Sequence, residues 1–267
     1  MTVRYVLDAA HGVGATPLQP APAVPESAGA ASPSLTAWLQ FLRGDSSAVF
    51  DGGPDEGPEA PVIWFPEYFE PRYSYPLIIW IQGPGRTAES DFRVAMESIS
   101  ERNYMGIALR TTLYNAADDE TDYVQLAARL KRLVGLVRRK QNVNGERIFL
   151  AGVGRAATIA LRLGLSQPQW FAGIIAPGAE AFAQNGAQHP LLREYRRLQG
   201  KRVLLGTFAD VSGQEQRTAG LGRLLHTAGL RVCERRYASL QQPSRELYSD
   251  IDRWIMREIY SGQTVRA

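Results

Sequence analysis

Few side chains of this 267-residue chain are suited to nucleophilic or acid–base chemistry near neutral pH. The histidines and the single cysteine are His11, His189, His226 and Cys233. Asp210 follows an apolar run, and His189 falls in a loop between two predicted strands. Loops that leave the carboxyl ends of strands surround the site in a doubly wound sheet, so His189 could face Asp210 across a pocket. A solvated loop histidine beside Pro190 is the other interpretation.

The other candidates fit structural roles. Thr158 and Ser166 lie in one predicted helix, where a hydroxyl packs against the sheet, bonds to a backbone carbonyl or ends the helix. His226 falls in a helix expected to cover the sheet, and Cys233 in a strand. No cluster of His, Cys, Asp and Glu has metal-ligand spacing. Ala157 replaces the third glycine of a dinucleotide-binding fingerprint, so a Rossmann dehydrogenase is only a distant alternative. We therefore expect neither a metal nor a cofactor.

The elements that must position these residues alternate between strands and helices. Apolar runs predict strands at residues 62–69, 75–81, 104–109, 147–152, 172–176, 201–206 and 231–237. Helical periodicity predicts helices at 91–102, 119–140, 212–228 and 243–260 and after Gly154. Ser212 and Glu215 fit a capping box for one of them. Such alternation predicts right-handed crossovers and a doubly wound, mainly parallel α/β sheet.

Residues 1–57 differ in texture from the rest. Alanine and proline dominate residues 15–33, which predicts an Ala/Pro-rich N-terminal arm without regular structure. Within it, residues 34–43 place Leu35, Trp38, Leu39 and Leu42 on one face of a short amphipathic helix. We therefore predict an arm over 1–57 and one folded domain over 58–267.

Composition bounds the class of protein. The chain is 45% hydrophobic and 21% charged, with a formal net charge of +3 and a pI near 9.1. This mild basicity does not by itself predict a nucleic-acid partner. Basic residues at 129, 131, 132 and 138–140 flank the apolar stripe of one helix, as a solvated face or, alternatively, for an anionic partner. Because no signal peptide or membrane-spanning run is evident, we predict a cytoplasmic protein without a membrane partner.

Four segments carry a family resemblance, in the right order along the chain. They are an apolar strand ending in Gln82–Gly85, the strand–corner–helix of Arg147–Leu165, the strand end Leu205–Asp210, and Arg236–Gln241 before the last helix. From about Pro61 to Ile259 the chain resembles the α/β-hydrolase superfamily, most closely its carboxylesterase, phospholipase and feruloyl-esterase-like branch. Gly152–Ala156 stands where that family has its nucleophile elbow, Gly-x-Ser-x-Gly.

The resemblance implies a site without its reactive groups. Gly154 occupies the nucleophile position and Gln241 the position of the catalytic base, while Asp210 keeps the acid. The oxyanion loop corresponds to Gln82, Gly83 and Pro84, and proline has no N–H to donate. The amide of Arg155 still matches a donor position. Acyl transfer needs a hydroxyl, an imidazole and an acid together, so this site lacks its chemistry.

We therefore predict a non-catalytic binding, scaffolding or regulatory protein with an unknown ligand or protein partner. One alternative is a hydrolase of ester or acyl substrates that uses Asp210 and His189. Another is a partner-binding module that uses the arm and its Trp38 helix, and a homo-oligomer is possible in either case. Glycine tolerates the strained corner that other residues do not, so we expect Gly154 to stabilise the fold relative to serine.

Overall fold

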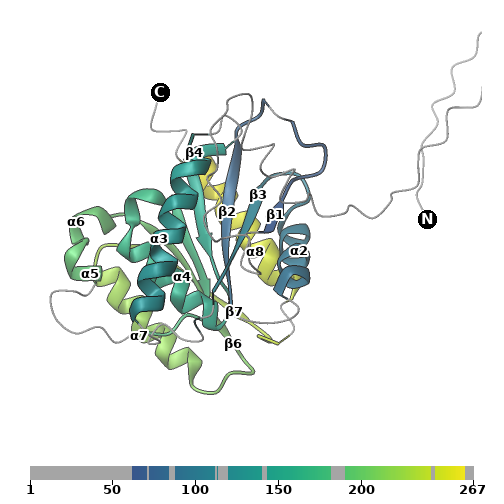
Figure 1. Ribbon diagram of the computed structural model, residues 1–267. Coiled ribbons are helices and arrows are strands. Elements are labelled where there is room, and N and C mark those ends of the chain that lie inside the picture. The colour runs from purple at the N-terminus through teal and green to yellow at the C-terminus, as the bar shows by residue number, and fades with distance from the viewer. Residues whose placement is uncertain are drawn as a thin grey trace, which may run out of the picture. The chain divides into compact units, whose positions relative to one another are not determined.

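The sheet is the central layer of the fold (Figure 1). The computed structural model describes residues 62–70, 72–83, 88–111, 113, 120–139, 143–181, 190–241 and 244–261. Its seven strands run in the order β1-β3-β2-β4-β5-β6-β7, with β1 antiparallel to β3 and every other pair parallel. The strands are β1 (Val62–Trp64), β2 (Tyr75–Gln82), β3 (Met105–Arg110), β4 (Val143–Ala151), β5 (Gly173–Pro177), β6 (Arg202–Phe208) and β7 (Arg231–Tyr237).

Helices cover both faces of this sheet. The helices are α2 (Ala88–Ile99), α3 (Glu120–Val137), α4 (Arg155–Ser166), the 3-10 turn η1 (Pro168–Trp170), α5 (Pro190–Arg193), α6 (Tyr195–Leu198), α7 (Gln214–Thr227) and α8 (Arg245–Ser261). Buried side chains of α3, α4 and α7 pack on one face, and those of α2 and α8 on the other. Alternate residues of β2 therefore face opposite layers, and the whole strand is buried. Over the residues described, no helix combines the length and apolar character needed to span a bilayer.

The predicted doubly wound, mainly parallel α/β architecture is confirmed, although the bounds of several elements differ. β4 begins at Val143, four residues before the predicted start at 147. β1 ends at Trp64 instead of residue 69, because Glu67 and Tyr68 form a turn in which Tyr68 has a left-handed φ of 55°. The segment before β6 contains the short helices α5 and α6 where we expected only a loop. Residues 1–57, with the predicted helix at 34–43, lie outside the described residues.

The predicted capping box at Ser212 is wrong. α7 begins at Gln214, its N-cap is Gly213 with a left-handed φ of 68°, and no side chain caps it. The buried Gln214 side chain instead accepts a hydrogen bond from the Phe208 N–H at 2.7 Å. The first residue of α7 therefore provides a hydrogen-bond acceptor for the backbone N–H at the end of β6.

The strand order changes direction at β2. β2 lies between β3 and β4, and the chain builds outward on both sides of it. Ligands of doubly wound sheets bind at such a switch point, outside the carboxyl ends of the strands. Those ends are Gln82 on β2 and Ala151 on β4, so topology alone places a candidate site beside Gly152–Gly154.

Candidate functional site

The sharp corner expected after β4 is present at Gly154. Its φ of 63° and ψ of −125° lie where residues with a side chain are strained. The Gly154 N–H donates to the Pro177 carbonyl at 2.9 Å, which ties the corner to the end of β5. Gly178 also lies against it, since a Cβ built on Gly178 would come within 2.9 Å of Gly154 Cα. The corner is thus a buried junction of two glycine backbones.

The Leu240 side chain covers this corner. A Cβ built on Gly154 would lie 3.1 Å from Leu240 Cδ1 and 3.4 Å from Cδ2. A side chain at residue 154 would therefore crowd the tip of Leu240, which would have to shift by a few tenths of an ångström. Arg155 and Gln241, the two residues that the sequence suggested as possible fillers, are both exposed. The sequence did not single out Leu240, although an apolar residue in an otherwise polar loop was a usable signal.

Asp210 holds the loop that carries Leu240. Its carboxylate accepts hydrogen bonds from Ser239 Oγ at 2.7 Å and from the Leu240 N–H at 3.0 and 3.1 Å to its two oxygens. The Gln241 N–H in turn donates to Ser239 Oγ at 3.1 Å. The structure thus brings Gly154, Asp210 and the backbone of Gln241 together around Leu240. Asp210 meets a serine and a backbone amide where a hydrolase acid would meet an imidazole.

These hydrogen bonds also weaken Asp210 as a base. The Ser239 hydroxyl and then the Leu240 amide lower the pKa of the Asp210 carboxyl below its ordinary value. A carboxylate with a lowered pKa attracts a proton weakly at neutral pH, so it is a poor general base for the neighbouring Ser239 hydroxyl. The contacts stabilise the loop above the unfolded-state pKa of aspartate and are lost as the pH falls through the lower folded-state pKa.

The oxyanion-type positions are described only in part. Gln82 is buried at the end of β2, where its carbonyl accepts a hydrogen bond from the Thr111 N–H at 2.9 Å, and Gly83 follows it. Arg155 is the first residue of α4, a position whose amide has no acceptor within the helix. Pro84 lies outside the described residues, and so does His189.

The remaining sequence candidates lie elsewhere. Thr158 Oγ1 accepts a hydrogen bond from the Glu180 N–H at 2.9 Å, so it ties down the segment after β5 instead of bonding to a helix carbonyl. Ser166 ends α4 and donates to the Arg162 carbonyl at 2.8 Å. His226 is exposed in the last turn of α7, and Cys233 is half-buried on β7. Within the described part of the chain, no three His, Cys, Asp or Glu side chains are grouped as metal ligands.

Placing serine at residue 154 tests whether the glycine stabilises the fold. We expect Gly154→Ser to lower the free energy of unfolding by about 1–3 kcal/mol, because serine is strained at this φ and its Cβ displaces Leu240. The melting temperature should fall by about 2–10 °C. Gly83→Ser is the control, since a Cβ there meets no atom within 4 Å. An unchanged or higher melting temperature for Gly154→Ser would refute this role of the glycine.

Comparison with solved structures identifies the fold. The chain superposes on a carboxylesterase from Bacillus cereus with a TM-score of 0.58 at 15% identity, covering 76% of this chain and 96% of the other. For a carboxylesterase from Mesorhizobium loti the TM-score is 0.56 at 13% identity, with 69% and 90% covered. A phospholipase/carboxylesterase from Dyadobacter fermentans gives 0.54 at 15% identity, with 73% and 95% covered.

These likenesses show a shared architecture at low sequence identity. The sequence itself matches no protein-family model and no curated protein. What the three esterases share with this chain is therefore the arrangement of strands and helices, and the chemistry has to be judged from the residues at the corner.

Proposed function

We propose that this chain, which has the α/β-hydrolase fold, is a non-catalytic member of that architecture that acts by binding, as a scaffold or a regulator. The observation that carries the proposal is the corner after β4. Residue 154 is a glycine, and the Leu240 side chain packs against the position where a side chain would begin. An acyl-transfer site needs that space for the attacking oxygen and for the substrate carbonyl.

The arrangement around Asp210 supports the same proposal. In a hydrolase the acid orients an imidazole, whereas here it binds Ser239 and Leu240 in the loop that covers the corner. The acid therefore contributes to closing the site. Loss of the nucleophile or the base alone costs a serine protease about 10⁶-fold in kcat, and this chain has neither group at the matching positions.

Ester hydrolysis is the direct test. We expect purified full-length protein to hydrolyse p-nitrophenyl acetate and butyrate no faster than buffer does, and a fluorophosphonate probe to add no mass to the chain. The variants Asp210→Ala with His189→Ala, and Ser239→Ala, serve as controls because they remove the acid, the loop histidine and the hydroxyl nearest Asp210. Turnover that the double substitution or Ser239→Ala abolishes would overturn the proposal in favour of a non-standard hydrolase. Turnover that survives all of them would point to a contaminant.

A further inference from the structure

Aromatic side chains gather in the segment between β1 and β2. The ring centres of Phe65 and Phe69 are 5.1 Å apart. Tyr75 joins them, with its ring 5.4 Å from that of Phe69 and 4.5 Å from that of Tyr73. Tyr68 precedes Phe69 in the chain. Because Tyr75 begins β2, these rings lie at the edge of the sheet where the parallel strands begin. We call Phe65, Tyr68, Phe69 and Tyr73 the aromatic surface.

Two rings of the aromatic surface are open to solvent. Tyr68 is 79% exposed and Tyr73 is 51% exposed, while Phe65 and Phe69 are only partly buried against the core. Within the described part of the chain, neither the Tyr68 nor the Tyr73 hydroxyl has a hydrogen-bond partner. Single exposed apolar residues are common, whereas contiguous exposed apolar side chains mark interaction sites. The aromatic surface is therefore a candidate binding surface.

Tyr68 is held in a strained conformation. Its φ is 55°, and it is the only non-glycine residue with a positive φ among those described. Such a conformation costs about 1–3 kcal/mol, whereas glycine adopts it freely. The Arg102 guanidinium lies 5.3 Å from the centre of the Tyr68 ring, an exposed contact that returns only about 0.5–1 kcal/mol. The turn itself therefore does not favour a tyrosine, but a ligand for the exposed ring would.

Backbone hydrogen bonds fix the aromatic surface in place. The Glu67 N–H donates to the Glu101 carbonyl at 2.6 Å, and the Tyr73 N–H donates to the Glu70 carbonyl at 3.0 Å. The Glu70 N–H in turn donates to the Tyr75 hydroxyl at 3.0 Å. Because the rings are held before a ligand arrives, little conformational freedom is lost on binding.

The side chains of the aromatic surface indicate the chemistry of the ligand. Exposed tyrosines offer flat faces to apolar rings and hydroxyl groups that can donate hydrogen bonds. A polyproline II segment presents apolar pyrrolidine rings, and its backbone carbonyls have no hydrogen bonds within the segment. Proline-rich segments accordingly bind to surfaces lined with aromatic side chains. A proline-rich segment therefore suits this surface.

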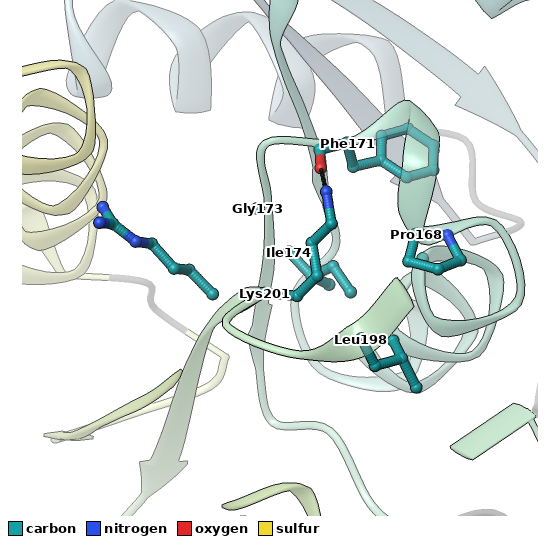
Figure 2. A pocket seen from close by; sticks show the side chains of 8 residues that line it. Pro168, Phe171, Gly173, Ile174, Leu198 and Lys201 are labelled. Carbon is teal, nitrogen blue, oxygen red and sulfur yellow. Dashed lines mark hydrogen bonds between the residues drawn. The ribbon is translucent and has the colours of Figure 1, made fainter. Parts of the chain in front are cut away.

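The apolar cleft beside β5 does not offer an alternative place for such a ligand. Pro168, Phe171 and Leu198 line this cleft, which is too narrow to admit a water molecule (Figure 2). Lys201 also lines it and donates from Nζ to the Phe171 carbonyl at 2.8 Å. A proline ring is larger than a water molecule, so it does not fit there.

The chain itself contains a proline-rich segment. Residues 17–25, which lie outside the described part, read Pro-Leu-Gln-Pro-Ala-Pro-Ala-Val-Pro. Polyproline II has three residues per turn, so Pro17 and Pro20 fall on one edge of such a helix, and Pro22 and Pro25 fall on another. We call residues 17–25 the proline segment. Its composition matches the ligand that the aromatic surface suits.

The connection to β1 brings the proline segment to this surface. Residues 26–61 join the proline segment to β1, and Phe65 directly follows the end of β1. The aromatic surface thus begins within about 10 Å of Val62, whereas the connection could extend over about 120 Å. A tethered segment that can span the gap acts at an effective concentration on the order of millimolar, well above that of a second copy in dilute solution.

We propose that the proline segment docks on the aromatic surface of the same chain, in the polyproline II conformation. Its proline rings pack on the Tyr68 and Tyr73 rings, and the two hydroxyls donate to its carbonyls. The docked segment keeps other proline-rich chains from this surface until one of them competes successfully. The inference does not depend on the proposed function, because Gly154 follows the opposite end of its strand.

Paramagnetic relaxation in the full-length chain tests this contact. Because Cys233 is the only cysteine, Cys233→Ser with Ala23→Cys places a nitroxide label within the proline segment alone. We expect the label to remove at least about half of the amide signal of Tyr68 and Tyr73, since millimolar effective concentration keeps a contact with a Kd of about 0.1 mM mostly formed. The amide signal of Leu224 on α7 should keep its intensity.

Variants of both partners show whether the rings and the prolines make the contact. Tyr68→Ala with Tyr73→Ala should weaken docking roughly tenfold or more, so the Phe69 signal should recover. Leu224→Ala is the matched control, because Leu224 is 47% exposed and Tyr73 is 51% exposed. Pro20→Gly with Pro25→Gly should release the segment in the same way, without any change in the folded domain.

Three results would overturn the proposal. One is a signal loss at Leu224 equal to that at Tyr73, or no loss at either. Another is a loss at Phe69 that both double substitutions leave unchanged. The third comes from a mixture of ¹⁵N-labelled chains without nitroxide and unlabelled chains that carry it. Signal loss in that mixture would assign the contact to a second copy instead of the same chain.

Discussion

Replacing Gly152 by alanine is expected to lower the free energy of unfolding by about 3 kcal/mol or more. A Cβ on Gly152 would lie 2.4 Å from the Ala156 carbonyl oxygen and 2.7 Å from its carbon. Both atoms belong to the backbone of the first turn of α4, so no side-chain rotation can relieve the overlap. Strand β4 and helix α4 would have to move apart, and the corner at Gly154 with them.

Thermal and denaturant unfolding measure this effect. The expected loss corresponds to a melting temperature about 6–12 °C lower for a domain of this size. Gly220→Ala on α7 is the matched control, because a Cβ there meets no atom within 4 Å. Alanine in a helix interior should stabilise that variant by about 0.5–1 kcal/mol. A Gly152→Ala protein as stable as the parent would mean that β4 and α4 do not approach as closely as described.

The second large effect is expected at Arg162, a buried arginine between α3 and α4. Its guanidinium lies 3.6 Å from the centre of the Tyr123 ring and pairs with Glu120, and its side chain is 3% exposed. The Tyr123 hydroxyl lies 3.1 Å from Ser166 Oγ, and burial raises the pKa of that phenol. We expect Arg162→Ala to cost about 3 kcal/mol, because it removes the stacking on Tyr123 and leaves a cavity between the helices.

Arg162→Met separates packing from charge. Methionine fills most of the same volume, and it removes a charged group whose burial is costly. Glu120 is 65% exposed, so solvent already screens much of its attraction to Arg162. We therefore expect the free energy of unfolding of Arg162→Met to lie within about 1 kcal/mol of the parent, measured by urea denaturation. A methionine variant as unstable as the alanine variant would show that the charge itself is needed.

Local patterns were sufficient for most of the architecture. The apolar run at 75–81 became β2 (Tyr75–Gln82), and the run at 231–237 became β7 with the same bounds. The helix predicted at 119–140, with its apolar stripe, is α3, and the buried face of that helix includes Leu126, Leu130, Leu133, Val134 and Val137. These elements are predictable because side-chain burial repeats with the period of the element itself. The predicted cap at Ser212 failed because Gly213, in a left-handed conformation, is the N-cap of α7, while the Gln214 side chain bonds to the Phe208 N–H.

Part of the candidate site, too, was predictable from the sequence and part was not. The glycine corner and Asp210 could be selected as candidates along the chain, because both follow apolar runs of strand length. Their partners could not, since Leu240 lies on a different loop, distant in sequence from Gly154. Which residue accepts a hydrogen bond or fills space at such a site depends on how the loops pack against one another, not on the spacing of residues along the chain.

The amino-acid sequence alone determined the alternation of strands and helices and the lack of a side chain at residue 154. Only the tertiary structure decided that Leu240 packs against Gly154 and that Asp210 binds Ser239. The physical reason is the distance along the chain over which each interaction acts. The repeat of a helix or a strand is set by residues a few positions apart, whereas side-chain packing depends on segments that only the folded sheet brings together.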